Sequence, residues 1–347
     1  MIIDEVNVPI VLAPMAGGPS TPELTAAVAE AGAFGVLAAG YLTAAALAER
    51  IAATRAATSA PFGVNLFVPS APTPPAVFSG YLEELRTRFP VGEPTYDTDD
   101  WDAKLDLLTA DPVAVVTFTF GCPSASEVRR LHEAGSEVWV TVTSPAEAAI
   151  AVTASADVLI AQGAEAGGHR ATFVDRVVDD GADPLGLLTL LQLLTASTDR
   201  PIVAAGGIAT GAGIAAVLAA GAAAAQLGTA FLGCREAGTN QLLRAAIGGD
   251  TPTMLTRAFT GRRARGLRNR FLTDHTDAPV AYPEIHYATG PLRAAARTSG
   301  DADAVNLWAG QAHSLTRQLP AAALVAELAA EAKTALESAL SRRIQSC

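Results

Sequence analysis

The chain has 347 residues and a net charge of −11, and its composition is 50% hydrophobic, 17% charged and only 5% aromatic. This length and hydrophobic content are sufficient for a large core built mainly from Ala, Val and Leu side chains. The negative charge disfavours non-specific binding to nucleic acid or to an anionic membrane, so neither is expected as a partner.

Eight short apolar segments are predicted to be the buried strands of a parallel sheet. In chain order they cover residues 10–13, 34–38, 62–67, 113–118, 137–142, 157–161, 202–205 and 223–227. The Ala-rich segments between them are predicted to be helices, because several begin with capping residues such as Ser20-Thr21-Pro22-Glu23. Gly32, Gly135 and Gly221 stand just before strands, where a preceding helix would end.

Eight successive βα units predict an α/β protein with a closed (β/α)₈ barrel, the TIM barrel, over residues 1–235. An open, doubly wound sheet is the alternative within the same class. It is disfavoured because no Gly-x-Gly-x-x-Gly follows the first strand, where a dinucleotide-binding sheet carries that motif.

Two stretches depart from the alternation of strands and helices. Residues 68–100 are Pro-rich and acidic and too long for an ordinary βα loop, so a lid or rim element is expected there. After residue 235 a C-terminal, mainly helical appendage is predicted over 236–347, packed on the barrel and within reach of the active site. Its predicted helices are 239–247, 301–316 and 321–341. The arginine-rich segment 257–270 is expected to form salt bridges with the acidic body.

The ends of predicted strands seven and eight carry glycine turns, at the position where barrel enzymes commonly bind phosphate. Gly206-Gly207 opens a helix, whose free N–H groups would face an anion. Gly228 and Thr229, which follow Gln226, would add a backbone N–H and a hydroxyl. A Gly-Gly turn can also be a plain tight connection. Two such turns in consecutive units favour a phosphate that is bound and not transferred.

Polar side chains at other strand ends suggest a site for a flat ring. Asn65 and Gln162 are amides within or beside apolar strands, and buried amides need partners. A flavin edge would supply matching donors and acceptors, and neighbouring backbone is the alternative partner. Pro14, Met15 and Ala16 follow the first strand, where backbone N–H groups would lie near the ring and Met15 would pack on it, unless Met15 only fills the core.

The segment after predicted strand six ends in Gly167-Gly168-His169. Adjacent glycines let the backbone approach a flat ligand, because they have no Cβ. Histidine is the side chain that titrates near neutrality, so His169 is the candidate catalytic residue. A metal site is not expected, because the other strand ends offer Gly, Asn and Gln in place of His, Asp or Glu.

The remaining features point to a cytoplasmic protein. Cys122, Cys234 and Cys347 are far apart, so neither a disulfide framework nor a zinc site is expected. The first five residues lack the basic and apolar regions of a signal peptide. The Ala-rich stretch 214–225 is broken by Gly221 and is too short to span a membrane. The sequence leaves the oligomeric state open.

Together these segments resemble the nitronate monooxygenases, once called 2-nitropropane dioxygenases, which are FMN-dependent barrel enzymes. The similar stretches run from the first strand to about Leu232 and more weakly through 261–271 and 282–308. They include Ala13-Pro14-Met15-Ala16-Gly17-Gly18, Gly63-Val64-Asn65-Leu66-Phe67, the 162–170 segment, Ala204-Ala205-Gly206-Gly207-Ile208-Ala209 and Gln226-Leu227-Gly228-Thr229-Ala230-Phe231-Leu232. The string Glu-Ala-Gly-Gly-His-Arg at 165–170 is the specific part.

The resemblance implies FMN held by Asn65, Gln162, Gly167, Gly207 and residues 226–229, with His169 as the active-site histidine. It also implies oxidation of alkyl nitronates, or of nitroalkanes, by O₂ to a carbonyl compound and nitrite. The family's rim over the substrate has no clear counterpart in 68–100. Two alternatives stay open: an FMN-dependent NAD(P)H reductase of quinones or enoyl-ACP, and a flavin-binding barrel without turnover.

Overall fold

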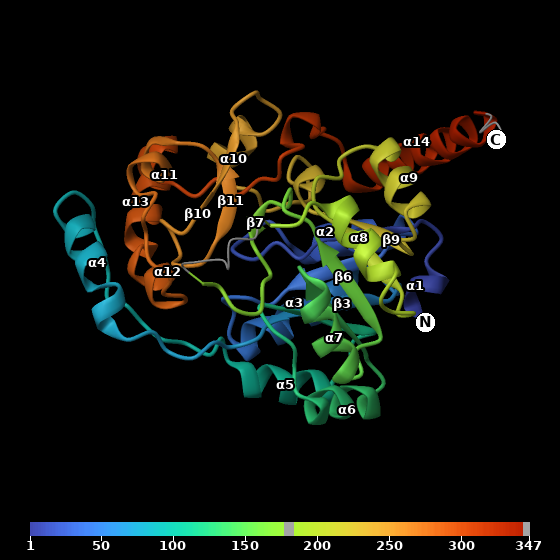
Figure 1. Cartoon of the computed structure of the whole chain (residues 1–347), viewed down its shortest axis with the longest axis horizontal. Helices are drawn as coiled ribbons and strands as arrows, with labels where there is room; N and C mark the ends of the chain where they lie inside the picture. The colour runs from blue at the N-terminus through green and yellow to red at the C-terminus, as the bar shows by residue number, and fades with distance from the viewer. Residues whose placement is uncertain (177–183, 343–347) are drawn as a thin grey trace.

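A computed structural model describes residues 1–176 and 184–342 of the chain (Figure 1). Its main sheet has eight parallel strands: β1 (Ile10–Leu12), β2 (Gly35–Ala38), β3 (Phe62–Phe67), β4 (Val115–Thr119), β5 (Glu137–Val142), β6 (Val158–Gln162), β8 (Ile202–Ala205) and β9 (Ala224–Leu227). They pair in the order β1-β9-β8-β6-β5-β4-β3-β2, and a bridge between Val11 and Phe34 closes the ring. The predicted (β/α)₈ barrel is confirmed, with each strand end within two residues of its expected position.

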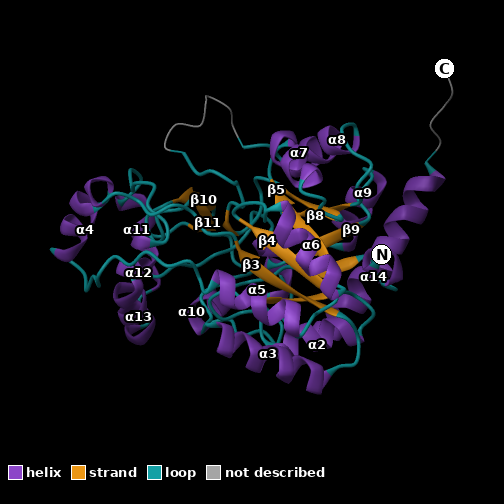
Figure 2. Cartoon of the chain, turned by 90° about the horizontal axis from the view of Figure 1, so that it is seen from below, coloured by secondary structure: helices purple, strands orange, loops and turns teal. Residues whose placement is uncertain are grey.

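Helices surround these strands (Figure 2). They are α2 (Pro22–Glu30), α3 (Ala44–Ala57), α5 (Trp101–Ala110), α6 (Ala125–Ala134), α7 (Pro145–Thr153), α8 (Leu187–Thr195) and α9 (Gly211–Ala219). Thr21 caps α2 by accepting a hydrogen bond from the Leu24 N–H, as the capping motif predicts. Ser124 and Glu127 form a reciprocal capping box at the start of α6.

The interior of the barrel is closed at its amino-terminal end. Val11, Phe34, Trp139 and Val203 belong to one buried cluster, in which the rings of Phe34 and Trp139 lie 5.4 Å apart. The short helix α1 (Ile2–Glu5) adds Ile3 to this cluster, and the backbone N–H of its first residue donates to Glu137 Oε1. A ligand site is therefore expected at the carboxyl ends of the strands, as is usual for this fold.

The chain after β9 is less regular than the predicted, mainly helical appendage. It contains α10 (Gln241–Ala246), α11 (Arg270–Asp274), α12 (Glu284–Ala288) and α13 (Gly290–Ser299). It also contains β10 (Thr253–Thr256) and β11 (Ala264–Leu267), which form a three-stranded sheet with β7 (Gly168–His169). This sheet joins the candidate catalytic segment of the barrel to the C-terminal part of the chain. The division into domains at residue 235 stays a prediction.

The predicted helix at 301–316 is wrong. That stretch has two 3₁₀ turns, η3 (Ala302–Ala304) and η4 (His313–Leu315), with extended chain between them. Trp308 forms a bridge with Gly266, and the backbone at Ala309-Gly310 packs so closely on Gly167 that a Cβ there would lie 2.4 Å from the Gly310 nitrogen. These tertiary contacts override a composition that suits a helix.

The last helix, α14 (Ala321–Ser341), has the predicted bounds and contacts α9 and α2 of the barrel (Figure 1). Residues 68–100 form η1 (Pro75–Val77) and α4 (Ser79–Arg86), which lie outside α12, away from the barrel, in both views. Phe78, Leu82 and Leu85 share a buried cluster with residues of the C-terminal part. Within the described residues, no helix has the length and hydrophobicity needed to cross a membrane.

Candidate active site

A cavity of about 520 Å³ lies at the carboxyl ends of the barrel strands, a size typical of small-molecule sites. All of the predicted site residues line it: Pro14, Met15, Ala16, Asn65, Gln162, Gly167, Gly168, His169, Gly206, Gly207, Gln226, Gly228 and Thr229. Parallel strands bring these distant segments together, because their carboxyl ends meet at one end of the barrel. What each residue does there stays a prediction.

The Gly206-Gly207 turn after β8 requires glycine. Gly206 has a φ of +111° and Gly207 a φ of +70°, which L-residues with a Cβ rarely adopt. A Cβ on Gly207 would also lie 2.9 Å from the Cβ of Glu165. Within the described residues, neither backbone N–H of this turn has a hydrogen-bond acceptor. The turn therefore offers two free donors at the cavity wall.

The following helix does not offer the free N–H groups that we expected. The Gly211 N–H donates to Glu331 Oε2 of α14 at 2.9 Å, and the Gly213 N–H donates to Thr210 Oγ1 at 3.1 Å. The amino terminus of α9 is thus already capped by the protein, with a carboxylate at the position where an anion would bind. The donors left on this side are those of the turn and of the Gly228-Thr229 segment, where the 3₁₀ turn η2 (Thr229–Phe231) begins.

The three amides of the site differ in how far the protein satisfies them. Asn65 Nδ2 donates to Thr117 Oγ1 and Thr119 Oγ1 at 2.9 and 3.0 Å. Gln162 donates from Nε2 to the His169 carbonyl and accepts at Oε1 from the Ala171 N–H. For these atoms the hydrogen-bond partners are neighbouring groups of the same chain. Gln226 differs, because its buried Oε1 has no partner in the described structure.

His169 lies on β7 and is fixed by its neighbours. Its Nε2 lies 2.9 Å from Thr260 Oγ1, and that hydroxyl donates to the Arg262 carbonyl at 3.0 Å. Because the hydroxyl proton is used there, Nε2 carries the ring proton and Nδ1 is left as the acceptor. Burial, followed by the charges of Arg262 and Arg293, lowers the pKa of His169 to about 3. The imidazole is therefore neutral at pH 7.

Aromatic rings surround this imidazole. The ring centroids of Phe120, Tyr282 and Trp308 lie 5.6, 5.7 and 5.8 Å from that of His169. Trp308 and Tyr282 come from the C-terminal part, which was expected from the sequence to lie within reach of the active site. This wall excludes water and supports the low pKa of the ring.

Several residues that the sequence did not assign to the site also line the cavity. They include Tyr41, Phe67, Phe120, His286, Arg293 and Asn306. Tyr41 and Phe120 have positive φ angles of 68° and 75°, a conformation that is uncommon for residues other than glycine. No sequence pattern indicates such angles. His275 and His313, the other two histidines of the C-terminal part, are absent from the described cavity lining.

The arginine-rich segment is only partly paired with acidic groups. Arg257 forms an ion pair with Asp175 at 2.7 Å, as expected. Arg262 instead donates to backbone carbonyls of Arg170 and Thr172 and lies 4.0 Å above the Phe120 ring. Arg265 donates to the Ala164 carbonyl. These arginines connect the C-terminal part to the 162–175 loop by carbonyl contacts as well as by charge.

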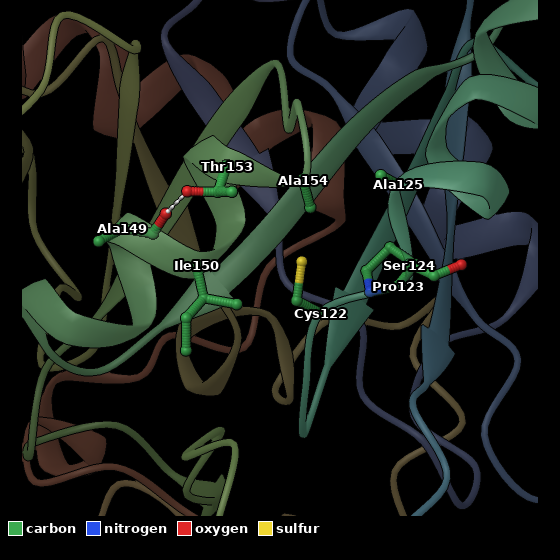
Figure 3. Close-up of a pocket in the computed structure, with 8 residues that line it drawn as sticks. All are labelled: Cys122, Pro123, Ser124, Ala125, Ala149, Ile150, Thr153 and Ala154. Atoms are coloured by element: carbon green, nitrogen blue, oxygen red, sulfur yellow. Dashed lines mark hydrogen bonds between the residues drawn. The ribbon is translucent and has the colours of Figure 1, made fainter.

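A second hollow, of about 500 Å³, is lined by Cys122-Pro123-Ser124-Ala125, by Ala149, Ile150 and Thr153 of α7 and by Ala154, which follows that helix (Figure 3). Burial raises the pKa of the Cys122 thiol to about 11, so it is a poor nucleophile at pH 7. The lining of this second hollow shares no residue with the cavity at the strand ends. The strand-end cavity, which all the predicted site residues line, is therefore the candidate active site.

Residues 2–331 match the family model described as nitronate monooxygenase. The chain belongs to this family. The resemblance inferred from the sequence is confirmed, and membership makes the protein an oxidoreductase. A relative named nitronate monooxygenase from Paraburkholderia phytofirmans is 40% identical over 96% of this chain and 94% of its own. Another of that name, from Pseudomonas aeruginosa, is 39% identical over 93% and 95%.

Two solved structures are similar over nearly the whole chain. The nitroalkane oxidase from Streptomyces ansochromogenes has a TM-score of 0.94 and 49% identity, covering 98% of this chain and 99% of its own. FabK from Thermotoga maritima has a TM-score of 0.75 and 28% identity, covering 98% and 97%. The barrel and the C-terminal part thus have counterparts together in a solved structure.

Proposed function

We propose that this enzyme uses FMN to oxidise small alkyl nitronates with O₂, giving a carbonyl compound and nitrite. The observation that carries the proposal is a neutral, buried His169 in the same cavity as the free donors of the Gly206-Gly207 turn. Family membership supports the nitronate chemistry. We infer that its substrates are a nitronate or nitroalkane and O₂. We also infer that it acts in the cytoplasm.

The residues present fit a flavin mononucleotide. The Gly206-Gly207 turn and the Gly228-Thr229 segment would hold a phosphate through backbone donors, without requiring Lys or Arg. The unpartnered Gln226 Oε1 would accept from an N–H of the flavin ring. Pro14, Met15 and Ala16 would flank the ring. Asn65, whose two Nδ2 protons go to Thr117 and Thr119, would position it through Oδ1, and Gln162 through its second Nε2 proton. When bound, FMN would supply the electron transfer that no side chain can carry out.

His169 would act on the substrate through Nδ1. Because Nε2–H is bonded to Thr260, the free lone pair of Nδ1 can accept a proton from the carbon next to a nitro group. With a nitronate already deprotonated, the same imidazole would orient the anion. The surrounding Phe120, Tyr282 and Trp308 would keep water from the reacting carbon.

Two measurements test the proposal. Purified protein should be yellow with one bound FMN, and it should release nitrite when propionate 3-nitronate is added in air. A colourless protein that takes up no FMN would contradict the cofactor, and a flavoprotein that releases no nitrite would contradict the substrate.

The reductase alternative has a separate test. NADH added without oxygen should leave the flavin oxidised if the enzyme acts on nitronates alone. Rapid bleaching together with absence of nitrite release would favour the NAD(P)H reductase. If the protein neither releases nitrite nor bleaches with NADH, the remaining alternative is a flavin-binding barrel without turnover.

A further inference from the structure

Arg293 of α13 is a buried cation that lines the strand-end cavity. The residue is only 8% exposed. It donates from Nη2 to the His286 carbonyl at 2.5 Å and from Nε to the Thr289 carbonyl at 3.4 Å. Within the described residues no carboxylate pairs with it. Its donors are partly satisfied, but its charge is not neutralised.

Two other arginines of this region, the buried Arg262 and the half-buried Arg244, are better compensated. Arg262 has Asp175 among the charges that act on it, and its guanidinium lies over the Phe120 ring. Arg244, outside the cavity lining, donates to three carbonyls, those of Gly233, Cys234 and Ala237. A buried charge is costly unless a partner compensates it. For Arg293 the cavity is the place where such a partner can bind.

His286 provides a second, independent sign of a missing ligand. It lines the same cavity, and its buried Nδ1 has no hydrogen-bond partner in the described structure. Its ring is stacked on Tyr41, with centroids 4.0 Å apart and an interplanar angle of 5°, and its carbonyl is held by Arg293. The imidazole is thus fixed in place while its Nδ1 has no partner in the described structure.

We propose that Arg293 and His286 form an anion subsite on the appendage side of the cavity, which binds a planar group with two anionic oxygens. A guanidinium donates to such a group through parallel N–H bonds, and the imidazole adds one further donor. The proposal rests on the proposed function, because it names how the substrate is held. The two oxygens belong either to the nitronate itself or to a carboxylate elsewhere on the substrate.

Anion binding tests the subsite without turnover. Calorimetric titration of the flavin-loaded protein with nitrate and with acetate should give saturable binding. In Arg293→Met the affinity should fall by about ten- to a hundredfold, the range expected for a lost charged hydrogen bond. Arg293→Lys should retain part of it. If Arg293→Met does not fold, Arg293→Gln keeps amide donors without the charge and should show a similar loss.

Arg244→Met is the matched control, since Arg244 also bonds carbonyls but does not line the cavity. It should bind both anions as the wild type does. Unchanged anion affinity in folded Arg293→Met or Arg293→Gln, or absence of anion binding in the wild type, would overturn the subsite.

Two substrates identify the source of the oxygens. If the subsite holds the nitronate, Arg293→Met should raise the KM for ethyl nitronate and for propionate 3-nitronate alike. If it holds a carboxylate, only the second KM should rise. Nitrite release with unaltered anion binding in the variant would refute the subsite alone. Loss of anion binding in a protein that never forms nitrite would refute the proposed function and leave the subsite standing.

Discussion

The two walls of the cavity are built in different ways. The barrel wall is backbone and small residues: the Gly206-Gly207 turn, the Gly228-Thr229 segment and the loop at Gly167-Gly168. The appendage wall is large side chains, with His286, Arg293 and Trp308 as its polar and aromatic members. Backbone donors suit a constant group such as a phosphate, whereas side chains can be exchanged to suit a substrate.

This difference suggests a division of labour, with the cofactor held by the barrel and the substrate selected by the C-terminal part. His169 stands at the boundary, because its strand β7 pairs with β11 of the C-terminal part while its loop follows β6 of the barrel. Substitutions on the barrel wall should then change cofactor affinity, and those on the other wall should change substrate binding.

The largest effect is expected at the boundary. His169→Asn should lower nitrite release by about 10²- to 10⁴-fold, the usual contribution of a general base, while FMN stays bound. Asparagine can still bond Thr260 but cannot take a proton. Flavin absorbance and the rate of nitrite formation measure the two properties separately.

The control for this variant is His132→Asn on α6, where the imidazole bonds Asp157 on the outside of the barrel. It should turn over as the wild type does. Equal rates in His169→Asn and wild type would contradict the catalytic assignment of His169. Loss of FMN from His169→Asn would mean that His169 also helps to hold the cofactor.

The barrel wall was predictable from the sequence because its signals are local. Apolar strand runs, capping residues and glycine pairs at strand ends each depend on a few neighbouring residues, and the barrel topology then brings them together. The helix end at α9 was the exception. Its partner Glu331 is 120 residues away, on α14, and no local pattern reveals it.

The appendage wall was not predictable, because its structure depends on distant contacts. Helices α11 and α12 have only five residues each, so packing and not propensity stabilises them. Tyr41 and His286 stack although 245 residues separate them. The stretch 301–316 has helical composition but is held extended by Gly266 and Gly167. Sequence alone did not assign Tyr41 or His286 to the site.

The free energy of unfolding should fall at acid pH because two imidazoles are buried at the boundary between the walls. The folded-state pKa of His169 is about 3 and that of His286 is also well below its usual value, both chiefly through burial. Below about pH 6.5 the unfolded chain therefore binds protons that the folded protein does not, and stability falls as the pH falls towards 3. Urea unfolding between pH 6 and pH 4.5 should show a smaller fall in His169→Asn, by at most about 1.4 kcal/mol per pH unit. Parallel curves for the two proteins would contradict this assignment.

Gly207→Ala tests the barrel wall directly. The positive φ and the 2.9 Å approach to Glu165 should distort the turn, and FMN affinity should fall about tenfold, as expected from a strain of 1–2 kcal/mol. Fluorescence titration of the apoprotein with FMN measures it. Gly300→Ala is the control, since Gly300 has a φ of +73° but open space around its Cβ position. It should lose stability yet bind FMN normally. Equal FMN affinities in both variants would mean that the turn does not hold the cofactor.

The smallest effect is expected at Glu331, and it decides which part of the barrel wall binds the phosphate. Glu331 bonds the Gly211 N–H and forms an ion pair with Arg317 at 2.6 Å. Glu331→Gln should lower the free energy of unfolding by only about 0.5 kcal/mol, because the pair is partly exposed to solvent. Glu327→Gln is the control, since Glu327 also pairs with Arg317.

FMN affinity should be the same in both variants if the Gly206-Gly207 turn provides the phosphate donors. Removing the Glu331 charge would instead tighten FMN binding if the phosphate lay at the amino terminus of α9, because the carboxylate would no longer compete with it there. A selective gain of affinity in Glu331→Gln would therefore move the phosphate from the turn to the helix.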